Sequence, residues 1–272
     1  MARWFKKFHL PKLPKLGNPP ADRAKVFLVP TFWGVSDPKF VEQIKVLCEE
    51  HVFDAGVHFA DNMLTWCRNN SMLEDEAFVN AWWTNVESES DKTIVWRRYI
   101  LSCAAYHCVH LKGDFVECGA YTGVGVKTVV DYLGAEDFPK NFWIYDLFEH
   151  DATMAHHSMP AHGPDLEGHV RAKFSRYPQV KIFKGNIPAV FGGGQCPKRI
   201  AYLHIDLNQA PAEIAALDAL FDRVVPGGIV ILDDYEWAGV YRGQKLAEDP
   251  WFESRGYRVF PLPTGQGIVL KR

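Results

Sequence analysis

Residues 114–132 read DFVECGAYTGVGVKTVVDY, which is a short apolar run, a turn with three glycines and a helix-like segment. Glycine lets the backbone approach a ligand closely and adopt positive φ angles. A strand that leads through such a turn into a helix forms the ligand crevice of open α/β sheets. We therefore expect residues 114–118 to be a strand of such a sheet, with a ligand at its carboxyl end.

Short apolar runs alternate with helix-like segments over the rest of the chain. The runs are FWIYD, VKIFKG, AYLHIDL and GIVILDD, and the chain ends in RVFPLP and GIVLKR. Continuous apolar runs are typical of strands buried on both faces, and their alternation with helices indicates parallel pairing. The sequence predicts a Rossmann-like α/β fold over residues 112–272, with a doubly wound, mostly parallel, seven-stranded sheet that ends in an antiparallel hairpin.

The region ahead of this domain, residues 36–111, carries mostly helical patterns. The pair Asp37–Pro38 suits a helix start. Ser71–Glu74 has the spacing of a capping box, and the apolar spacing over 93–111 predicts a longer helix. We therefore expect a helical N-terminal cap.

The first 35 residues are basic and punctuated by prolines, and no acid precedes Asp22. Such a segment is typical of a flexible, solvated arm. The alternative is weak contact with a partner or an anionic membrane surface.

Composition limits the class of protein. Hydrophobic residues at 47% and charged residues at 23% are ordinary for a globular chain, and a net charge of -3 gives no bulk attraction to nucleic acid. The six cysteines include no C-x-x-C pair, and no apolar stretch reaches the ~18 residues that cross a bilayer. We expect a cytoplasmic homo-oligomer without a membrane span or signal peptide.

The glycine turn favours one class of cofactor. Its spacing is G-x-x-x-G-x-G, whereas a dinucleotide site requires G-x-G-x-x-G. Glu117 precedes the glycines and suits a cation, and the methionine half of S-adenosylmethionine carries an ammonium and a sulfonium. Asp146 ends the next strand, where a carboxylate can accept both hydroxyls of a ribose. The alternatives are an ordinary tight turn and a helix cap.

Acids also end two later strands, namely Asp206 after AYLHI and the pair Asp233–Asp234 after GIVIL. Hard oxygen ligands without cysteine or paired histidine suit Mg²⁺ better than zinc. Three anions gathered without a cation would be costly, so these acids predict a metal site. The alternative is that some of them cap helices or bind backbone amides.

Several motifs taken in order, VECGAYTG, YDLFEH, HIDLN, LFDRVVPGGIVILDDY and LPTGQGIVLKR, resemble the macrocin O-methyltransferase (TylF-like) family. The resemblance covers about residues 94–272 and implies a class I S-adenosylmethionine enzyme that methylates a hydroxyl, usually on a sugar or glycoside. It also implies Mg²⁺ held by Asp206, Asp233 and Asp234. The cofactor-binding residues that it implies are Glu117, Gly119, Tyr121, Thr122, Gly123, Asp146, Phe148, Asn186 and Asp206.

One position departs from the family pattern. The family commonly has D-x-D-L-Y where this chain has Asp206-Leu-Asn208, and the amide of Asn208 cannot take a proton at neutral pH. Asp206 and Asn208 remain the catalytic candidates. Either the metal alone acidifies the acceptor hydroxyl or a histidine is the base, and the candidates are His204, His150, His156, His157, His162 and His169.

Two other functions fit the same motifs. The first is a catechol or phenol O-methyltransferase, with an acceptor site lined by aromatic side chains such as Trp82, Trp83, Tyr121 and Trp237. The second is a non-catalytic S-adenosylmethionine-binding module, in which Asn208 would mark lost chemistry.

Overall fold

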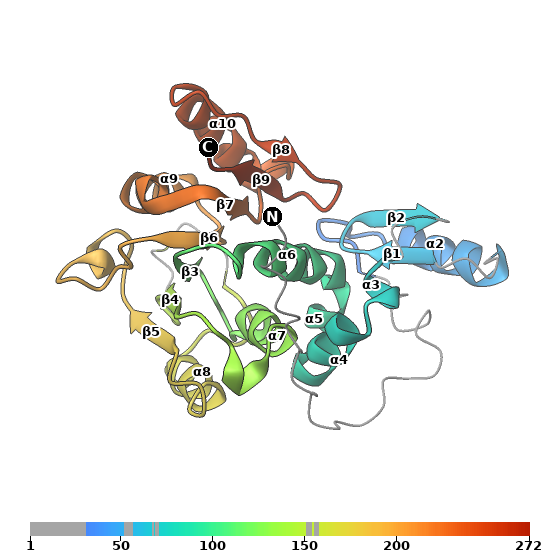
Figure 1. Ribbon diagram of the computed structural model, residues 1–272. Helices are drawn as coiled ribbons and strands as arrows, with labels where there is room; N and C mark the ends of the chain where they lie inside the picture. The colour runs from blue at the N-terminus through green and yellow to red at the C-terminus, as the bar shows by residue number, and fades with distance from the viewer. Residues whose placement is uncertain (1–30, 52–56, 67, 69–70, 151–153, 155–157) are drawn as a thin grey trace, which may run out of the picture.

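The computed structural model describes residues 31–51, 57–66, 68, 71–150, 154 and 158–272. A seven-stranded sheet lies at its centre (Figure 1). The strands are β3 (Asp114–Cys118), β4 (Phe142–Asp146), β5 (Val180–Lys184), β6 (Ile200–Ile205), β7 (Val224–Leu232), β8 (Phe260–Pro261) and β9 (Gly267–Leu270).

The strand order is β5-β4-β3-β6-β7-β9-β8. Strands β3 to β7 pair in parallel, whereas β9 pairs antiparallel with both β7 and β8. The predicted seven-stranded sheet with a terminal hairpin is therefore confirmed. The chain runs outward from β3 through β4 to β5 and then returns to β6, so a topological switch point lies between β3 and β6.

Helices cover both faces of the sheet. The longer ones in this domain are α6 (Val95–Cys108), α7 (Val124–Tyr132), α8 (Leu166–Lys173), α9 (Ala210–Leu220) and α10 (Arg242–Glu253). Short 3₁₀ turns are η1 (Ala135–Asp137), η2 (Ala189–Phe191), η3 (Phe221–Arg223) and η4 (Gly239–Tyr241).

Two apolar clusters fill the space between helices and sheet. Tyr202 and Leu203 are adjacent in β6 and point to opposite clusters, because successive side chains of a strand alternate. Leu101 of α6 lies in the first cluster and Leu217 of α9 in the second, and all four side chains are buried. This alternation explains the continuous apolar runs in the sequence.

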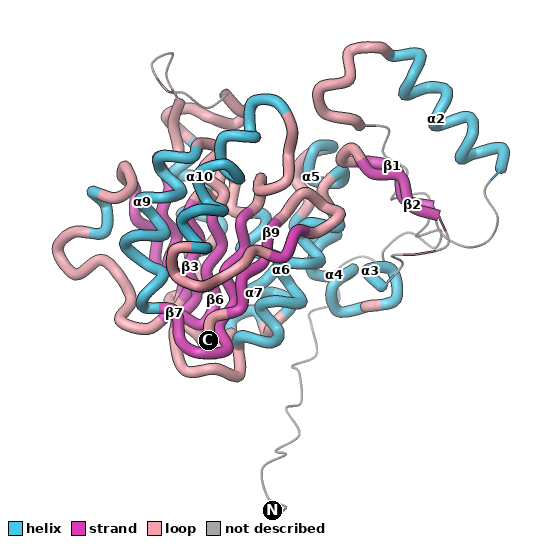
Figure 2. The backbone as a smooth tube through the Cα atoms, turned by 90° about the horizontal axis from the view of Figure 1, so that it is seen from above, coloured by secondary structure: helices cyan, strands magenta, loops and turns pink. Residues whose placement is uncertain are grey.

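The N-terminal part of the described chain forms a separate layer beside the sheet domain (Figure 2). Its elements are α2 (Pro38–His51), β1 (Val57–Ala60), β2 (Met63–Trp66), α3 (Ser71–Glu74), α4 (Glu76–Asn85) and α5 (Glu89–Thr93). Helix α4 packs on α7, and the Tyr132 hydroxyl donates to Asp75 Oδ2 at 2.8 Å.

The expectation of an all-helical cap missed one hairpin. Strands β1 and β2 pair antiparallel, and the two residues between them, Asp61 and Asn62, have φ angles of 54° and 59°. Asp and Asn tolerate positive φ, which a two-residue type I′ hairpin turn requires at both positions. The strands have four residues each, which is too short for the alternation of side chains to reveal them.

The predicted helix starts had mixed outcomes. Helix α2 begins at Pro38, and Asp37 Oδ1 accepts a hydrogen bond from the Lys39 amide at 2.9 Å, as expected. The capping box predicted at Ser71–Glu74 was wrong, because those residues are themselves helix α3. The structure has its capping box at Ser88–Asp91, at the start of α5.

Some predictions concern segments that the structure covers in part. The basic arm lies almost wholly outside the described residues. Within them, no helix is long and apolar enough to cross a bilayer. The cysteines for which the structure gives a side-chain state, Cys103, Cys108, Cys118 and Cys196, are free thiols.

Candidate active site

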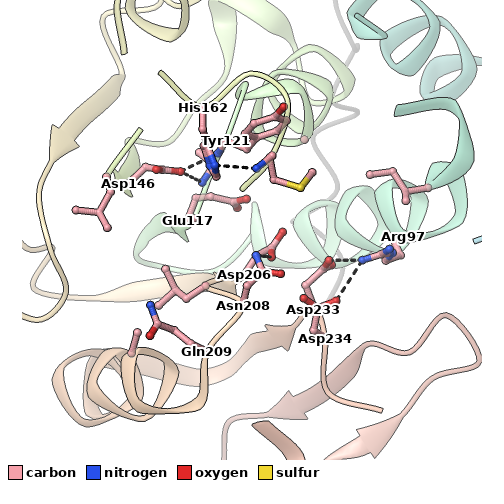
Figure 3. Close-up of a pocket in the computed structure, with 18 of the residues that line it drawn as sticks. Arg97, Glu117, Tyr121, Asp146, His162, Asp206, Asn208, Gln209, Asp233 and Asp234 are labelled. Atoms are coloured by element: carbon pink, nitrogen blue, oxygen red, sulfur yellow. Dashed lines mark hydrogen bonds and ion pairs between the residues drawn. The ribbon is translucent and has the colours of Figure 1, made fainter. Parts of the chain in front are cut away.

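A cavity of about 500 Å³ lies at the carboxyl ends of the parallel strands (Figure 3). Its volume is in the range typical of small-molecule sites. The turns that follow strands β3 to β7 line it on one side, and α5, α6 and Trp33 of the N-terminal layer line it on the other. Of the residues predicted from the sequence, it brings together Glu117, Gly119, Tyr121, Asp146, Asn186, Asp206, Asn208, Asp233 and Asp234.

The glycine turn packs directly against the end of β6. Gly119 has a φ of 88°, and a Cβ at this position would lie 1.8 Å from the carbonyl oxygen of Asp206. The Gly119 amide donates to the Tyr145 carbonyl at 2.8 Å, which holds the turn to β4 as well. Only glycine fits here, because any side chain would push apart the two strand ends that form the crevice.

Asp146 holds this turn in place. Its Oδ2 accepts hydrogen bonds from the amides of Ala120 (2.6 Å) and Tyr121 (2.7 Å), and its Oδ1 accepts one from the Phe148 amide (2.6 Å). Three backbone amides thus already occupy the carboxylate that we expected to bind a ribose. Its role toward a ribose remains a prediction, and its observed contacts fit the alternative of a turn-capping acid.

Three of the predicted cofactor residues do not line the cavity. Thr122 uses its carbonyl to accept a hydrogen bond from Lys173, and Gly123 is the N-cap of α7 with a φ of 76°. Phe148 is buried in the apolar cluster under α7 and α8. Thr122 and Gly123 therefore lie on the far side of the turn from the cavity, whereas Tyr121 and Gly125 on either side of them line it.

Asp233 is held by strong contacts on both carboxylate oxygens. Its Oδ1 accepts from Gln266 Nε2 at 2.7 Å and lies 3.3 Å from His204 Nε2, and its Oδ2 pairs with Arg97 Nη1 at 2.7 Å. Burial by itself would raise the pKa of Asp233, but Arg97 and His204 outweigh it and lower that pKa far below its ordinary value. Asp233 is therefore a carboxylate under all ordinary conditions.

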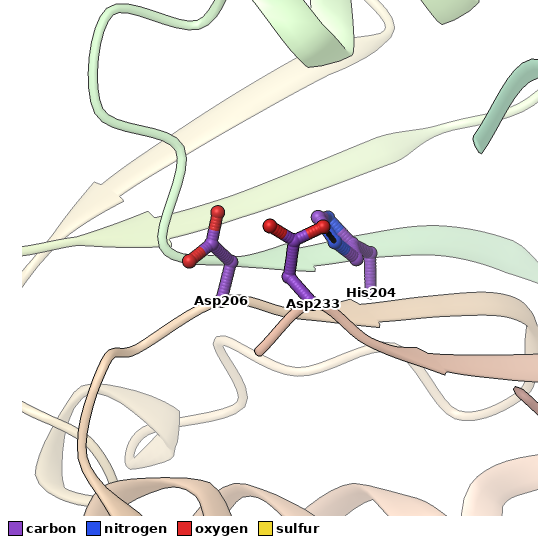
Figure 4. Close-up of side chains that lie close together, drawn as sticks. All are labelled: His204, Asp206 and Asp233. Carbon is purple, nitrogen blue, oxygen red and sulfur yellow. Dashed lines mark hydrogen bonds and ion pairs between the residues drawn. The ribbon is translucent and has the colours of Figure 1, made fainter. Parts of the chain in front are cut away.

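His204 lies between two carboxylates and is fully buried. Its Nδ1 is 2.9 Å from Glu117 Oε1, and its ligand atoms cluster with those of Asp206 and Asp233 within 4.8 Å (Figure 4). Burial lowers the pKa of His204, but Glu117 and Asp233 together raise it to about 10. This raised pKa favours a protonated imidazole at neutral pH, which argues against His204 as the general base.

Asp206 and Asp234 have weaker contacts with positively charged or hydrogen-bonding groups than Asp233 has. Asp206 Oδ1 lies 3.4 Å from the Asn208 side-chain nitrogen, and Asp234 Oδ1 lies 3.5 Å from Arg97 Nη1. Burial and the neighbouring acids raise the pKa of Asp206 well above its ordinary value. Burial and Asp233 raise the pKa of Asp234 to about 7.

Arg97 is a cation among these acids that was not predicted from the sequence. Helix α6 directs it into the acid cluster, where its Nε and Nη2 bind the two Asp61 oxygens at 2.9 and 2.8 Å while Nη1 binds Asp233. The Trp237 ring lies 5.5 Å from the guanidinium carbon. Because Arg97 already offsets Asp233, crowding of three acids is not by itself proof of a metal.

The donor set nevertheless fits a divalent cation. Among the described residues, the ligand atoms that lie within 4.8 Å of one another belong to His204, Asp206 and Asp233, and this group leaves out Asp234. Asp206 and Asp234 nevertheless line the same cavity, and burial and the neighbouring acids raise the pKa of both. A hard cation such as Mg²⁺ would stabilise both carboxylates. Asp233 Oδ2 already binds Arg97, so Asp233 could be a third ligand only if that oxygen bound the cation and Arg97 together.

Of the four aromatic candidates, two line the cavity and two belong to the N-terminal layer. Tyr121 and Trp237 line the cavity, whereas Trp82 is buried in the core of the N-terminal layer and Trp83 packs against that core. Sequence reasoning missed Trp33 and Tyr241, which also line the cavity.

Of the loop histidines, His162 lines the cavity. The His150 ring stacks on the His162 ring, with 5.9 Å between the ring centroids. His169 lies elsewhere and pairs with Glu87 at 3.1 Å. The candidates His156 and His157 fall outside the described residues.

Solved structures share this fold. The O-methyltransferase NovP superimposes with a TM-score of 0.56 at 18% identity, covering 65% of this chain and 80% of its own. CalS11, a calicheamicin methyltransferase, gives a TM-score of 0.52 at 13% identity, covering 75% of this chain and 94% of its own. At these identities the likeness establishes the fold alone.

Sequence comparison establishes the family. A curated relative from Streptomyces olivaceus, 8-demethyl-8-(2,3-dimethoxy-alpha-L-rhamnosyl)-tetracenomycin-C 4'-O-methyltransferase, is 30% identical over 179 residues. The match covers 54% of this chain and spans 65% of the length of that relative. Residues 103–245, which include the glycine turn, Asp206, Asp233 and Asp234, match the macrocin-O-methyltransferase (TylF) family. The chain belongs to the macrocin-O-methyltransferase (TylF) family.

Proposed function

We propose that this protein is an S-adenosylmethionine-dependent O-methyltransferase that acts on a hydroxyl of a sugar or glycoside. One observation carries the proposal: in a chain of this family, a single cavity at the switch point joins the glycine turn after β3 to the acids after β6 and β7. A cofactor and an acceptor can therefore meet there.

The names of relatives support the acceptor class. The relative from Streptomyces olivaceus is named for 4'-O-methylation of a compound that carries a rhamnosyl group, and CalS11 is titled a TDP-rhamnose 3'-O-methyltransferase. In this chain Trp33, Trp237 and Tyr241 line the cavity, and the Trp237 ring lies 5.5 Å from the Arg97 guanidinium carbon. Such faces can stack on a sugar or on a phenol, so both acceptor classes enter the test.

A bound Mg²⁺ would lower the pKa of the acceptor hydroxyl. Asp206 and Asp234 would hold it, with Asp233 as a third ligand shared with Arg97. Neither His204, which carries a proton, nor the Asn208 amide, which cannot accept one, would take the proton of the hydroxyl. Asn208, whose side-chain nitrogen lies 3.4 Å from Asp206 Oδ1, would orient the hydroxyl by hydrogen bonding.

Calorimetric titration of the purified protein tests the cofactor. We expect S-adenosylmethionine to bind with and without Mg²⁺, and NAD, the control ligand, not to bind. Binding of NAD alone, or of neither ligand, would refute the proposal.

An acceptor screen then follows S-adenosylhomocysteine release with glycosides and with catechols, each with Mg²⁺ or EDTA. Turnover of glycosides supports the proposed acceptor class, whereas turnover confined to catechols supports the phenol alternative. If the cofactor binds and no acceptor turns over, a binding module becomes the better account.

A further inference from the structure

The charged groups that line the cavity are mostly acids, and two arginines oppose them. Arg97 is committed to Asp61, Asp233 and Asp234 through contacts of 2.7 to 3.5 Å. Arg98, the next residue of α6, also lines the cavity, but it forms no ion pair with any residue in the described part of the chain. Its Nε is buried without a hydrogen-bond partner. An unpaired guanidinium nitrogen of this kind is costly unless a ligand satisfies it.

The position of Arg98 explains the third glycine of the turn. A Cβ at Gly125 would lie 2.7 Å from Arg98 Nη1 and 3.1 Å from its Cζ. The guanidinium therefore packs against the first turn of α7, and Gly125 gives it room. Any side chain at this position would displace Arg98 from the cavity wall.

The same corner of the cavity lies at the amino end of helix α7, beside Arg98. The amino end of a helix carries a partial positive charge, and a guanidinium beside it adds to that charge. Helix α7 has no acidic residue in its first turn and no side-chain cap that would offset this. An anion is therefore stabilised at this corner, whereas the acids elsewhere in the cavity would repel it.

We propose that Arg98 binds the carboxylate of the methionine half of S-adenosylmethionine. This inference rests on the proposed function and adds to it a residue that fixes the orientation of the cofactor. That carboxylate is the anionic group of the cofactor, and a planar guanidinium can bind it through two parallel hydrogen bonds. Arg97 cannot serve in its place, since its nitrogens already bind Asp61 and Asp233.

Arg98 has one competing role, because its charge also lowers the pKa of Asp206 and Asp233. If Arg98 acted only by balancing these acids, its loss would change the affinity for any adenosine ligand by a similar factor. Contact with the carboxylate instead makes the loss specific to ligands that carry this group.

The test is a binding cycle with two ligands that differ only in the carboxylate. They are S-adenosylhomocysteine and its decarboxylated analogue, 5'-(3-aminopropylthio)-5'-deoxyadenosine, and calorimetry measures Kd for each. The wild-type protein should prefer S-adenosylhomocysteine by roughly 10- to 100-fold, the range expected for hydrogen bonds between charged groups. Arg98→Met should lose most of this preference, while its Kd for the analogue stays nearly unchanged.

Two further variants control the cycle. Arg171→Met removes an arginine whose side chain is 49% exposed on α8 and should keep the wild-type preference. Arg98→Lys keeps the charge without the planar fork, so it should retain part of the preference and still fold if Arg98→Met does not.

The outcomes separate this inference from the proposed function. If Arg98→Met weakens both ligands equally, or keeps the wild-type preference, the assignment of the carboxylate to Arg98 is overturned while the methyltransferase proposal stands. If the wild-type protein binds neither ligand, the proposed function itself fails, and the inference fails with it.

Discussion

The aspartates of the cavity differ in how well their charges are satisfied. Asp233 has partners on both oxygens and a lowered pKa, whereas the pKa of Asp234 is raised to about 7 although the two residues are adjacent. Burial and the Asp233 charge raise the pKa of Asp234, whereas Arg97 at 2.7 Å and His204 lower that of Asp233; Arg97 lies 3.5 Å from Asp234. Asp234 is therefore the residue through which a metal role can be tested with least damage to the fold.

Asp234→Asn should abolish Mg²⁺-dependent turnover and leave S-adenosylmethionine binding within about two-fold. Loss of a hydrogen-bond partner behind a metal ligand costs about 10- to 100-fold in activity, so loss of a ligand should cost at least about 100-fold. The control is Asp222→Asn, whose side chain is 94% exposed far from the cavity. Full turnover of Asp234→Asn in EDTA would rule out the metal role.

At the scale of elements, the turn between β3 and α7 packs against the end of β6, so the position of β6 fixes the backbone beside the proposed cofactor site. Gly119→Ala places a Cβ 1.8 Å from the Asp206 carbonyl at a φ of 88°. We expect it to reduce the free energy of unfolding by roughly 2–4 kcal/mol and to weaken S-adenosylmethionine binding.

The matched control is Gly168→Ala in α8, where a Cβ would meet no atom within 4 Å. Alanine favours helices, so this variant should gain about 0.5–1 kcal/mol. Urea unfolding of both variants measures the difference. Equal stabilities would show that the turn can move away from β6.

Helices α9 and α10 bury a pair of acids behind the cavity. Glu213 and Glu248 are 2% and 0% exposed, and Glu213 Oε1 also lies 3.4 Å from the Leu207 amide in the loop after β6. Burial and Glu248 raise the pKa of Glu213 well above its ordinary value. Burial raises the pKa of Glu248 from 4.5 to about 7.

This pair predicts how stability depends on pH. A carboxyl with a raised folded-state pKa binds its proton more tightly in the folded protein. Its contribution is therefore complete below pH 4.5 and lost as the pH rises through about 7. Glu248→Gln should flatten this part of the curve and make the protein roughly 1–3 kcal/mol more stable than wild type at pH 8.

Urea unfolding at pH 5 and pH 8 checks this, with Glu253→Gln on the exposed end of α10 as the control. A wild-type stability that rises over this range, with the same slope in Glu248→Gln, would contradict the prediction.

At the scale of the molecule, Arg97 joins the N-terminal layer to the sheet domain. It links Asp61 in the β1–β2 turn to Asp233 at the end of β7, and the Trp33 indole also donates to Asp61 at 3.0 Å. Arg97 and Asp233 both line the cavity, so this bridge also forms part of its wall. The layer is thereby tied to the part of the domain that carries the proposed chemistry.

Arg97→Met should lower the free energy of unfolding by roughly 3–5 kcal/mol, because it leaves Asp61 and Asp233 buried without their partner. Arg171→Met removes a half-exposed pair with Glu167 and should cost less than about 1 kcal/mol. Urea unfolding at pH 7 compares them. Similar losses in the two variants would mean that water or another cation already screens the buried acids.

The sequence by itself determined the sheet, its terminal hairpin and the acids at its carboxyl edge. Apolar runs and glycine spacing act between near neighbours in the chain, and parallel strands bring their ends together whatever the loops between them. Glu117, Asp206 and Asp234 could therefore be placed in one crevice before any coordinates were known. The short β1–β2 hairpin escaped because each strand is only four residues long.

Only the tertiary structure decided which groups oppose those acids. Arg97 lies 136 residues before Asp233 in the chain, and no local pattern shows that Arg97 and Arg98 of α6 point into the cavity rather than into solvent. The proton on His204 likewise depends on Glu117, 87 residues away, and on Asp233. Charge states follow from burial and from distances of a few ångströms between residues remote in sequence, and these exist only once the chain has folded.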